Sequence, residues 1–121
     1  MARKPPHEKK PNPLRVSASF RAFVLDQLNE AGDVLPRSMF GGVGLYCEGV
    51  FFGIIAGDVL YLKVDDTTRP DYERAGMGPF MPYPRRGGTM RYYAVPADVL
   101  ENAAELGRWA RRAIRVAERG R

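Results

Sequence analysis

Three short apolar runs follow one another in the middle of the chain. They cover residues 39–46, 50–56 and 59–64. Glu48-Gly49 separates the first run from the second, and Gly57-Asp58 separates the second from the third. Two-residue connections that contain glycine are typical of tight hairpin turns. The pattern therefore predicts three strands of an antiparallel meander.

Helical periodicity precedes this meander. Residues 14–31 place apolar side chains at helical spacing, namely Phe20, Phe23, Val24, Leu28 and Ala31. Ser17 or Ser19 can cap the start of this helix, and Gly32 stands where it should stop. The pattern predicts a first helix before the sheet.

Two more helical regions follow the meander. Residues 67–75 come after Asp65-Asp66, which can cap a helix, and they carry Pro70 near the first turn, so we expect a short helix. Residues 97–119 form the last helical region, with a short turn over 97–101 and a longer helix from Asn102 or Ala103.

Two further strands are predicted between these helices. Residues 80–83 could pair as a strand, but Pro82 and Pro84 confine it to an edge or make it irregular. Residues 89–95 alternate more regularly and end at Pro96. The predicted order is α-β-β-β-α-β-β-α. This order is typical of an α+β fold with two layers, in which helices pack on one face of a mostly antiparallel five-stranded sheet.

The composition fits one compact domain. The chain has 121 residues, 45% of them hydrophobic, which gives room for residues 14–121 to form a single domain. No apolar run approaches the roughly 20 residues of a membrane span, and no secretory signal begins the sequence. Cys47 is the single cysteine, so neither a disulfide framework nor a cysteine zinc cluster can form. We expect a cytoplasmic protein.

The formal net charge of +5 is unevenly distributed. Residues 1–13 combine lysines and arginine with four prolines and have almost no apolar side chain to bury, which predicts a disordered basic Pro-rich tail. The other basic cluster lies in the last helix. The segment between these two ends is nearly neutral, so basicity belongs to the two ends of the chain.

Five arginines of the last helix fall on one stripe about 100° wide. They are Arg108, Arg111, Arg112, Arg115 and Arg119. One hypothesis is a ridge that follows nucleic-acid phosphates. The alternative is an ordinary solvated helix face, with the opposite side packed through Trp109 and Ile114.

A second candidate surface lies near the last predicted strand. Arg85 and Arg86 belong to a basic, glycine-containing loop, and Arg91 shares a strand face with Tyr93. Aromatic and basic side chains on a sheet can stack single-stranded bases. The competing interpretation is that the tyrosines close the rim of the core.

Catalytic arrangements find little support. His7 is the single histidine and lies in the predicted tail, which removes histidine-based triads and metal sites. The glycines of residues 41–44 lead into a strand and not into a helix, so they do not form a dinucleotide cradle. We expect them to relieve crowding where the strand bends or where the first helix crosses. Asp58 fits a turn, and Asp65 or Asp66 fits a helix cap. No catalytic residue, cofactor or metal is predicted.

The sequence also resembles a known family. The stretch Arg37-Ser38-Met39-Phe40-Gly41-Gly42-Val43-Gly44-Leu45-Tyr46, residues 51–56 and residues 60–65 look like the N-terminal domain of the TfoX/Sxy competence regulators. The likeness continues through Pro79-Phe80, residues 90–93 and Trp109-Ala110, and it covers roughly residues 14–117. It implies an α+β fold like that of the secretion-chaperone class. The chain is similar to stand-alone, single-domain members, which lack the second domain of full competence regulators.

The resemblance implies a bacterial regulator. It suggests a relation to proteins that help a cyclic-AMP-responsive transcription factor to activate DNA-uptake genes, and it supplies no catalytic motif. We therefore predict a non-enzymatic regulatory or adaptor domain that contacts a transcription-regulatory protein. The alternative is a direct, largely nonspecific nucleic-acid binder that uses the arginine helix and the basic tail. The sequence leaves a homodimer open.

Overall fold

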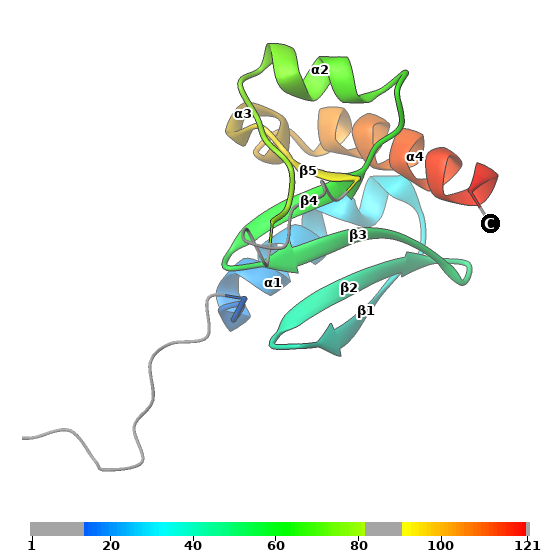
Figure 1. The fold of residues 1–121 in the computed structure, drawn as a ribbon. Helices are drawn as coiled ribbons and strands as arrows, with labels where there is room; N and C mark the ends of the chain where they lie inside the picture. Colours follow the sequence, from blue (N-terminus) through cyan, green and yellow to red (C-terminus); the bar gives the residue numbers. More distant parts are fainter. Residues whose placement is uncertain (1–13, 82–90, 121) are drawn as a thin grey trace, which may run out of the picture.

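The structure is a computed structural model that describes residues 14–81 and 91–120. Within this part of the chain, five antiparallel strands form one sheet in the order β1-β2-β3-β4-β5 (Figure 1). The strands are β1 (Val34–Met39), β2 (Gly42–Cys47), β3 (Val50–Ala56), β4 (Val59–Lys63) and β5 (Tyr92–Ala94). The helices are α1 (Ala18–Gln27), the 3-10 helix η1 (Leu28–Ala31), α2 (Arg69–Arg74), α3 (Ala97–Leu100) and α4 (Ala103–Arg119).

The predicted α+β class and the five-stranded antiparallel sheet are confirmed, but the order of elements differs. The structure has α-β-β-β-β-α-β-α-α, counting α1 and η1 together. An unpredicted strand, β1, precedes the meander and pairs along its whole length with β2. Pro36 lies in its centre and hides the strand signal. Proline is tolerated there because β1 is an edge strand.

The predicted strand over residues 80–83 is wrong in the part that the structure describes. Pro79 makes only an isolated bridge to Tyr93, and the Phe80 N–H donates to the Tyr92 carbonyl at 2.7 Å. Residues 82 and 83 lie outside the described residues. The same holds for the predicted tail at 1–13 and for residues 89 and 90 of the last predicted strand, which is observed as β5.

The three hairpins share one turn geometry. Each turn has two residues with positive φ: Phe40 and Gly41 at 52° and 87°, Glu48 and Gly49 at 50° and 79°, Gly57 and Asp58 at 55° and 57°. Such pairs match the right-handed twist of the strands they join. The third turn also anchors the start of α1, because the Ser17 N–H donates to Asp58 Oδ1 at 2.8 Å. The Ser17 hydroxyl in turn caps α1 by accepting from the Phe20 N–H.

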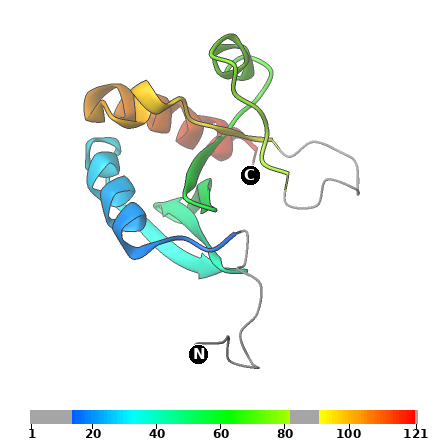
Figure 2. The same ribbon diagram turned by 90° about the vertical axis from the view of Figure 1, so that its left-hand side faces the viewer.

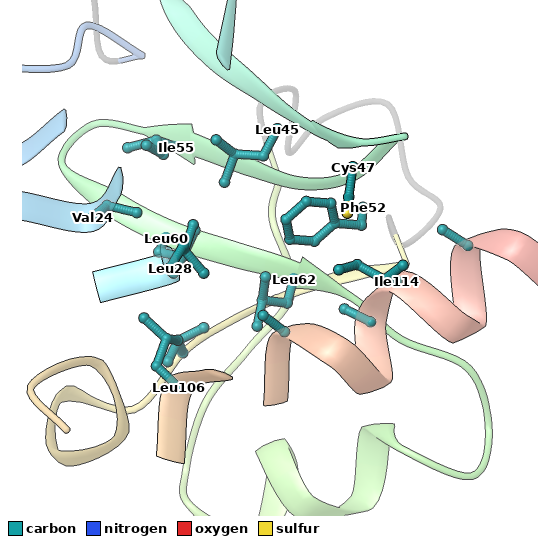
Figure 3. Close-up of a cluster of buried hydrophobic side chains, with 14 of the residues drawn as sticks. Val24, Leu28, Leu45, Cys47, Phe52, Ile55, Leu60, Leu62, Leu106 and Ile114 are labelled. Carbon is teal, nitrogen blue, oxygen red and sulfur yellow. The ribbon is translucent and has the colours of Figure 1, made fainter. Parts of the chain in front are cut away.

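The main core lies between the sheet and the helices. α1, η1 and α4 lie on one side of the sheet (Figure 2), and their apolar side chains meet Leu45, Phe52 and Leu62 (Figure 3). These three side chains are fully buried. α2 joins the same core through Tyr72, which lies edge-on to Trp109 of α4 at 4.7 Å between ring centroids.

A register shift in β3 changes which of its side chains face the helices and which face the smaller cluster on the other side of the sheet. Val50 and Phe52 point to the helices, and after the shift so does Ile55, whereas Ile54 belongs to a smaller cluster with Phe80 and Tyr92. A strict alternation would place Ile54 beside Phe52. One extra residue therefore changes which β3 side chains face the helices.

Gly42 lies where backbone carbonyls of two other segments approach β2 closely. A Cβ atom at this position would lie 2.7 Å from the carbonyl oxygen of Ile55 and 3.4 Å from that of Leu14. Backbone oxygens cannot move aside as a flexible side chain can. Gly42 therefore relieves crowding, as expected, and the crowding comes from the Ile55 and Leu14 carbonyls.

We predict that Gly42→Ala destabilises the domain by about 2 kcal/mol, because the added methyl group forces the strand off the Ile55 carbonyl. Gly78→Ala is the matched control, since a Cβ there meets nothing within 4 Å. Urea unfolding of both variants checks this. Equal stability of the two variants would show that β2 can shift at no cost.

We also predict that Glu48→Asn stabilises the domain by about 0.5–1 kcal/mol, because asparagine tolerates the left-handed conformation that Glu48 adopts at φ 50°. Glu48→Gln removes the same charge without this tolerance and should leave stability unchanged. Thermal unfolding followed by circular dichroism measures both. A rise with glutamine as large as that with asparagine would assign the effect to charge.

Candidate partner-binding surfaces

The five arginines that the sequence places on one stripe of α4 define the α4 arginine face: Arg108, Arg111, Arg112, Arg115 and Arg119. α4 begins after Asn102, whose side chain accepts from the Glu105 N–H at 3.0 Å, as expected for a cap. The opposite side of the helix is buried through Leu106, Ala110, Ala113 and Ala117. The helix therefore packs on the core through its apolar side, and its basic side faces outward.

Two contacts join α4 to α2, one from the arginine face and one from Trp109 beside it. Arg112 donates to Asp71 Oδ2 at 2.7 Å, and both side chains are about one-third exposed. Beside this pair, Trp109 donates from Nε1 to Glu105 Oε1 at 3.0 Å while its ring meets Tyr72. Burial raises the pKa of Tyr72, with the Arg112 charge opposing that rise. Arg112 thus has a structural partner within the domain.

Three more arginines of the face are also engaged. Arg111 donates to the Glu30 carbonyl at the end of η1 at 2.7 Å. Arg119 donates to Asp65 Oδ2 at 2.9 Å, and Arg108 pairs with Glu105 one turn earlier on α4. The pair with Arg108 lowers the pKa of Glu105, and the Trp109 hydrogen bond adds to the effect.

Arg115 is the exception on this face. Its side chain makes no hydrogen bond, ion pair or ring contact within the described ranges. It lines a hollow of about 310 Å³ together with Trp109 and the side chains of Arg108, Arg111 and Arg112. The other two predicted site residues, Arg85 and Arg86, lie outside the residues that the structure describes.

Asp65 organises the segment between β4 and α2. Its Oδ1 accepts from the Thr67 and Thr68 N–H groups at 2.9 and 3.1 Å and from the Thr67 hydroxyl at 2.6 Å. Its Oδ2 accepts from Arg119. The Thr67 hydroxyl has the largest effect and lowers the pKa of Asp65, burial opposes it, and Arg119 and the Thr68 and Thr67 N–H groups lower it further, so that this pKa lies well below its usual range. Asp65 therefore closes the turn that leads into α2, but the predicted capping of the helix by Asp65 or Asp66 is wrong, because the N-cap position of α2 is Thr68 and no side chain caps it.

The candidate second surface with Arg91 and Tyr93 exposed on one strand face is not observed, because Tyr93 is buried. Tyr93 is buried on the helix side of the sheet, where it meets Tyr72, and Arg91 lies 3.5 Å from Asp66. The interpretation that the tyrosines serve the core holds for Tyr72 and Tyr93.

A different aromatic row crosses the other face of the sheet. Tyr46 stacks on Phe51 at 5.1 Å, and Phe51 meets Tyr92 at 5.5 Å. Cations close both ends, with Arg37 over Tyr46 and Lys63 over Tyr92 at 5.7 and 5.4 Å. Burial raises the pKa of Tyr92 to about 12. The ring faces are thus largely occupied by one another and by these cations.

A hollow of about 570 Å³ that was not predicted lies between α1 with the residues before it and the β1–β2 hairpin. We call it the α1–hairpin groove, lined on one side by Arg15, Val16, Ala18, Arg21, Ala22 and Leu25, and on the other by Ser38, Gly41, Gly42 and Val43. No sequence spacing reveals it, because Arg15 precedes the helix and the hairpin wall includes the unpredicted strand β1.

Neither a metal-binding cluster nor a membrane-spanning helix is found in the described ranges. No group of three histidine, cysteine, aspartate or glutamate side chains is placed to hold a metal ion in this part of the chain. No helix within the same residues has the length and apolar character to cross a membrane.

The fold and these surfaces define a small α+β domain with a helix-covered antiparallel meander and an arginine-rich last helix. The chain belongs to the TfoX N-terminal domain family, whose model matches residues 26–117, most of the sequence. The match includes the β1–β2 hairpin and α4 as far as residue 117, with every member of the arginine face except Arg119. No curated protein matches the sequence.

We predict that Asp65→Asn lowers stability at neutral pH by about 1 kcal/mol, because a neutral amide is a weaker acceptor for the Thr67, Thr68 and Arg119 donors. A lowered pKa means that the contribution is present above about pH 4 and is lost as the pH falls further. The gap between wild type and variant should therefore shrink on acidification. Urea unfolding at several pH values measures it, with the exposed Asp26→Asn as control. A gap that stays constant below pH 4 would contradict this assignment.

Proposed function

We propose that this domain is a non-enzymatic adaptor that acts in the cytoplasm through protein contacts with the transcription machinery. Membership of the TfoX N-terminal domain family supports a role like that of a competence regulator. The partner that this role suggests is a transcription-regulatory protein, such as a cyclic-AMP-responsive factor.

The observation that carries the choice of a protein partner is the internal pairing of the α4 arginine face. Arg112 and Arg119 lie against Asp71 and Asp65, and Arg108 lies against Glu105. A phosphate that approached these arginines would also approach the carboxylates, which cancel much of the positive potential. Each exposed pair contributes only about 0–1 kcal/mol, so the pairs lower the attraction for phosphate more than they lock the side chains.

A direct nucleic-acid binder remains the second candidate, favoured by the hollow around Arg115. There an unpaired guanidinium, three further arginines and the partly buried Trp109 surround one space. Arginine and tryptophan together can hold a phosphate beside a stacked base. This surface is small, and one unpaired arginine predicts a shallow dependence of binding on salt.

The first experiment tests nucleic-acid binding by fluorescence anisotropy, with labelled duplex and single-stranded oligonucleotides at low and near-physiological salt. The adaptor proposal expects that binding is lost at near-physiological salt and that Arg115→Glu behaves like Arg21→Glu, which makes the same charge change on another surface. A complex that survives this salt and weakens at least tenfold in Arg115→Glu alone would establish the nucleic-acid alternative instead.

The second experiment titrates the intact chain into a purified cyclic-AMP-responsive transcription factor and into RNA polymerase by isothermal calorimetry. The adaptor proposal expects saturable binding to at least one of them at near-physiological salt, with little change in Arg115→Glu. Absence of heat and of complex formation with both proteins would refute the proposal.

A further inference from the structure

Few arginines in the described structure lack a carboxylate, carbonyl or aromatic partner, and two of those few line the same hollow. Outside α4, Arg69, Arg74 and Arg91 pair with carboxylates, and Arg37 lies over Tyr46. Arg15, Arg21 and Arg115 make no such contact within the described residues. Arg15 and Arg21 both line the α1–hairpin groove.

Arg21 is the more informative of the two, because the residue is half-buried while no side-chain nitrogen in the described structure is buried without a partner, so its guanidinium stays in contact with solvent. A guanidinium carries five donors that a carboxylate can accept. Arg112, which is similarly half-buried, donates to Asp71. Arg21 has no carboxylate partner within the described residues, and none of the residues that line its groove is acidic. The lining of the groove therefore carries two positive charges and no negative one.

The rest of the lining is small or apolar. Ala18 and Ala22 keep the α1 wall low, Gly41 and Gly42 keep the hairpin wall low, and Leu25 supplies apolar contact area. Val43 lies at the base of the groove, where it is largely buried in the core. Gly42 cannot carry a side chain for the steric reason given above. Low walls let an extended or helical segment approach the two arginines closely.

This combination distinguishes the groove from a nucleic-acid surface. Nucleic-acid binding relies on several cations spaced along a backbone, whereas here two arginines stand over a mostly apolar surface. Carboxylates pair with arginine through two parallel hydrogen bonds, and neighbouring aliphatic side chains can fill an apolar lining. A peptide segment that carries both groups complements the charge and the lining together.

We propose that the α1–hairpin groove binds an acidic, partly apolar segment of the partner protein, with Arg15 and Arg21 holding its carboxylates. The inference rests on the adaptor function proposed above, since it makes a protein the occupant. It also assigns partner recognition to a surface remote from the α4 arginine face.

The experiment pans a phage-displayed library of short random peptides on the intact chain and measures the affinity of the enriched peptides by fluorescence anisotropy. We expect enriched sequences that combine aspartate or glutamate with leucine, isoleucine, valine or phenylalanine. Their addition should shift the backbone amide resonances of Ser38, Gly41 and Gly42 in a ¹⁵N-labelled sample. Enrichment of sequences without acidic residues, or no enrichment, would overturn the inference.

Two matched pairs of variants test the location. Arg21→Glu removes a groove cation, and Arg115→Glu makes the same change on α4. Ala22→Glu adds a carboxylate to the groove while both arginines stay, and Ala104→Glu makes the same change at an exposed position of α4. We expect at least a tenfold loss of peptide affinity in the two groove variants and a change within about twofold in the two controls. Ala22→Glu keeps the test valid if Arg21→Glu fails to fold. Equal losses in groove and control variants would overturn the inference.

The same variants separate this inference from the adaptor function. If the transcription factor or the polymerase binds wild type and Ala22→Glu equally, the groove is not its docking site, and the adaptor function stands. If acidic peptides select the groove while neither protein binds, the adaptor function fails, and the chemistry of the groove stands.

Discussion

The packing of α4 across the meander is the constraint on which the other features depend. Its buried side combines Leu106, Ile114 and Val116 with one glycine and three alanines. The glycine lets the helix lie close to η1, since a Cβ at Gly107 would be 3.0 Å from the Glu30 side chain. That closeness brings Arg111 to the Glu30 carbonyl, Arg112 to Asp71 and Arg119 to Asp65. The arginine face is therefore a consequence of how α4 is seated, and three of its members tie the helix to η1, to α2 and to the end of β4.

Much of the fold could be predicted because the relevant signals are local. The two-residue turns, the Ser17 cap, the start of the last helix near Ala103 and the helical spacing of apolar residues each depend on a few adjacent positions, and all appear in the structure. β1 could not be predicted in the same way, because Pro36 weakens the local strand pattern. The pairing that holds β1 comes entirely from β2. The segment expected as a strand from residue 80 does lie beside β5, but only Pro79 forms a bridge with it, to Tyr93.

The candidate sites were less predictable because they depend on contacts between distant segments. The sequence places five arginines on one stripe of α4, but their partners Asp65, Asp71 and Glu30 lie far away along the chain. A pattern on one helix cannot tell a free cation from a paired one. The groove is a stronger case, since its two walls come from α1 and from a hairpin whose first strand was not foreseen.

The charged side chains with and without partners lie on different surfaces, and this distribution indicates which surface is best suited to bind another molecule. The aromatic row on the open face of the sheet is closed at both ends by Arg37 and Lys63, and the α4 face is largely neutralised by carboxylates. Both surfaces already hold the contacts that a ligand would otherwise supply. Binding energy is available chiefly where charged groups still lack partners, because a new ion pair there replaces water and not an existing contact. By this criterion the α1–hairpin groove, with Arg15 and Arg21, has more to gain from a partner than the more conspicuous arginine helix.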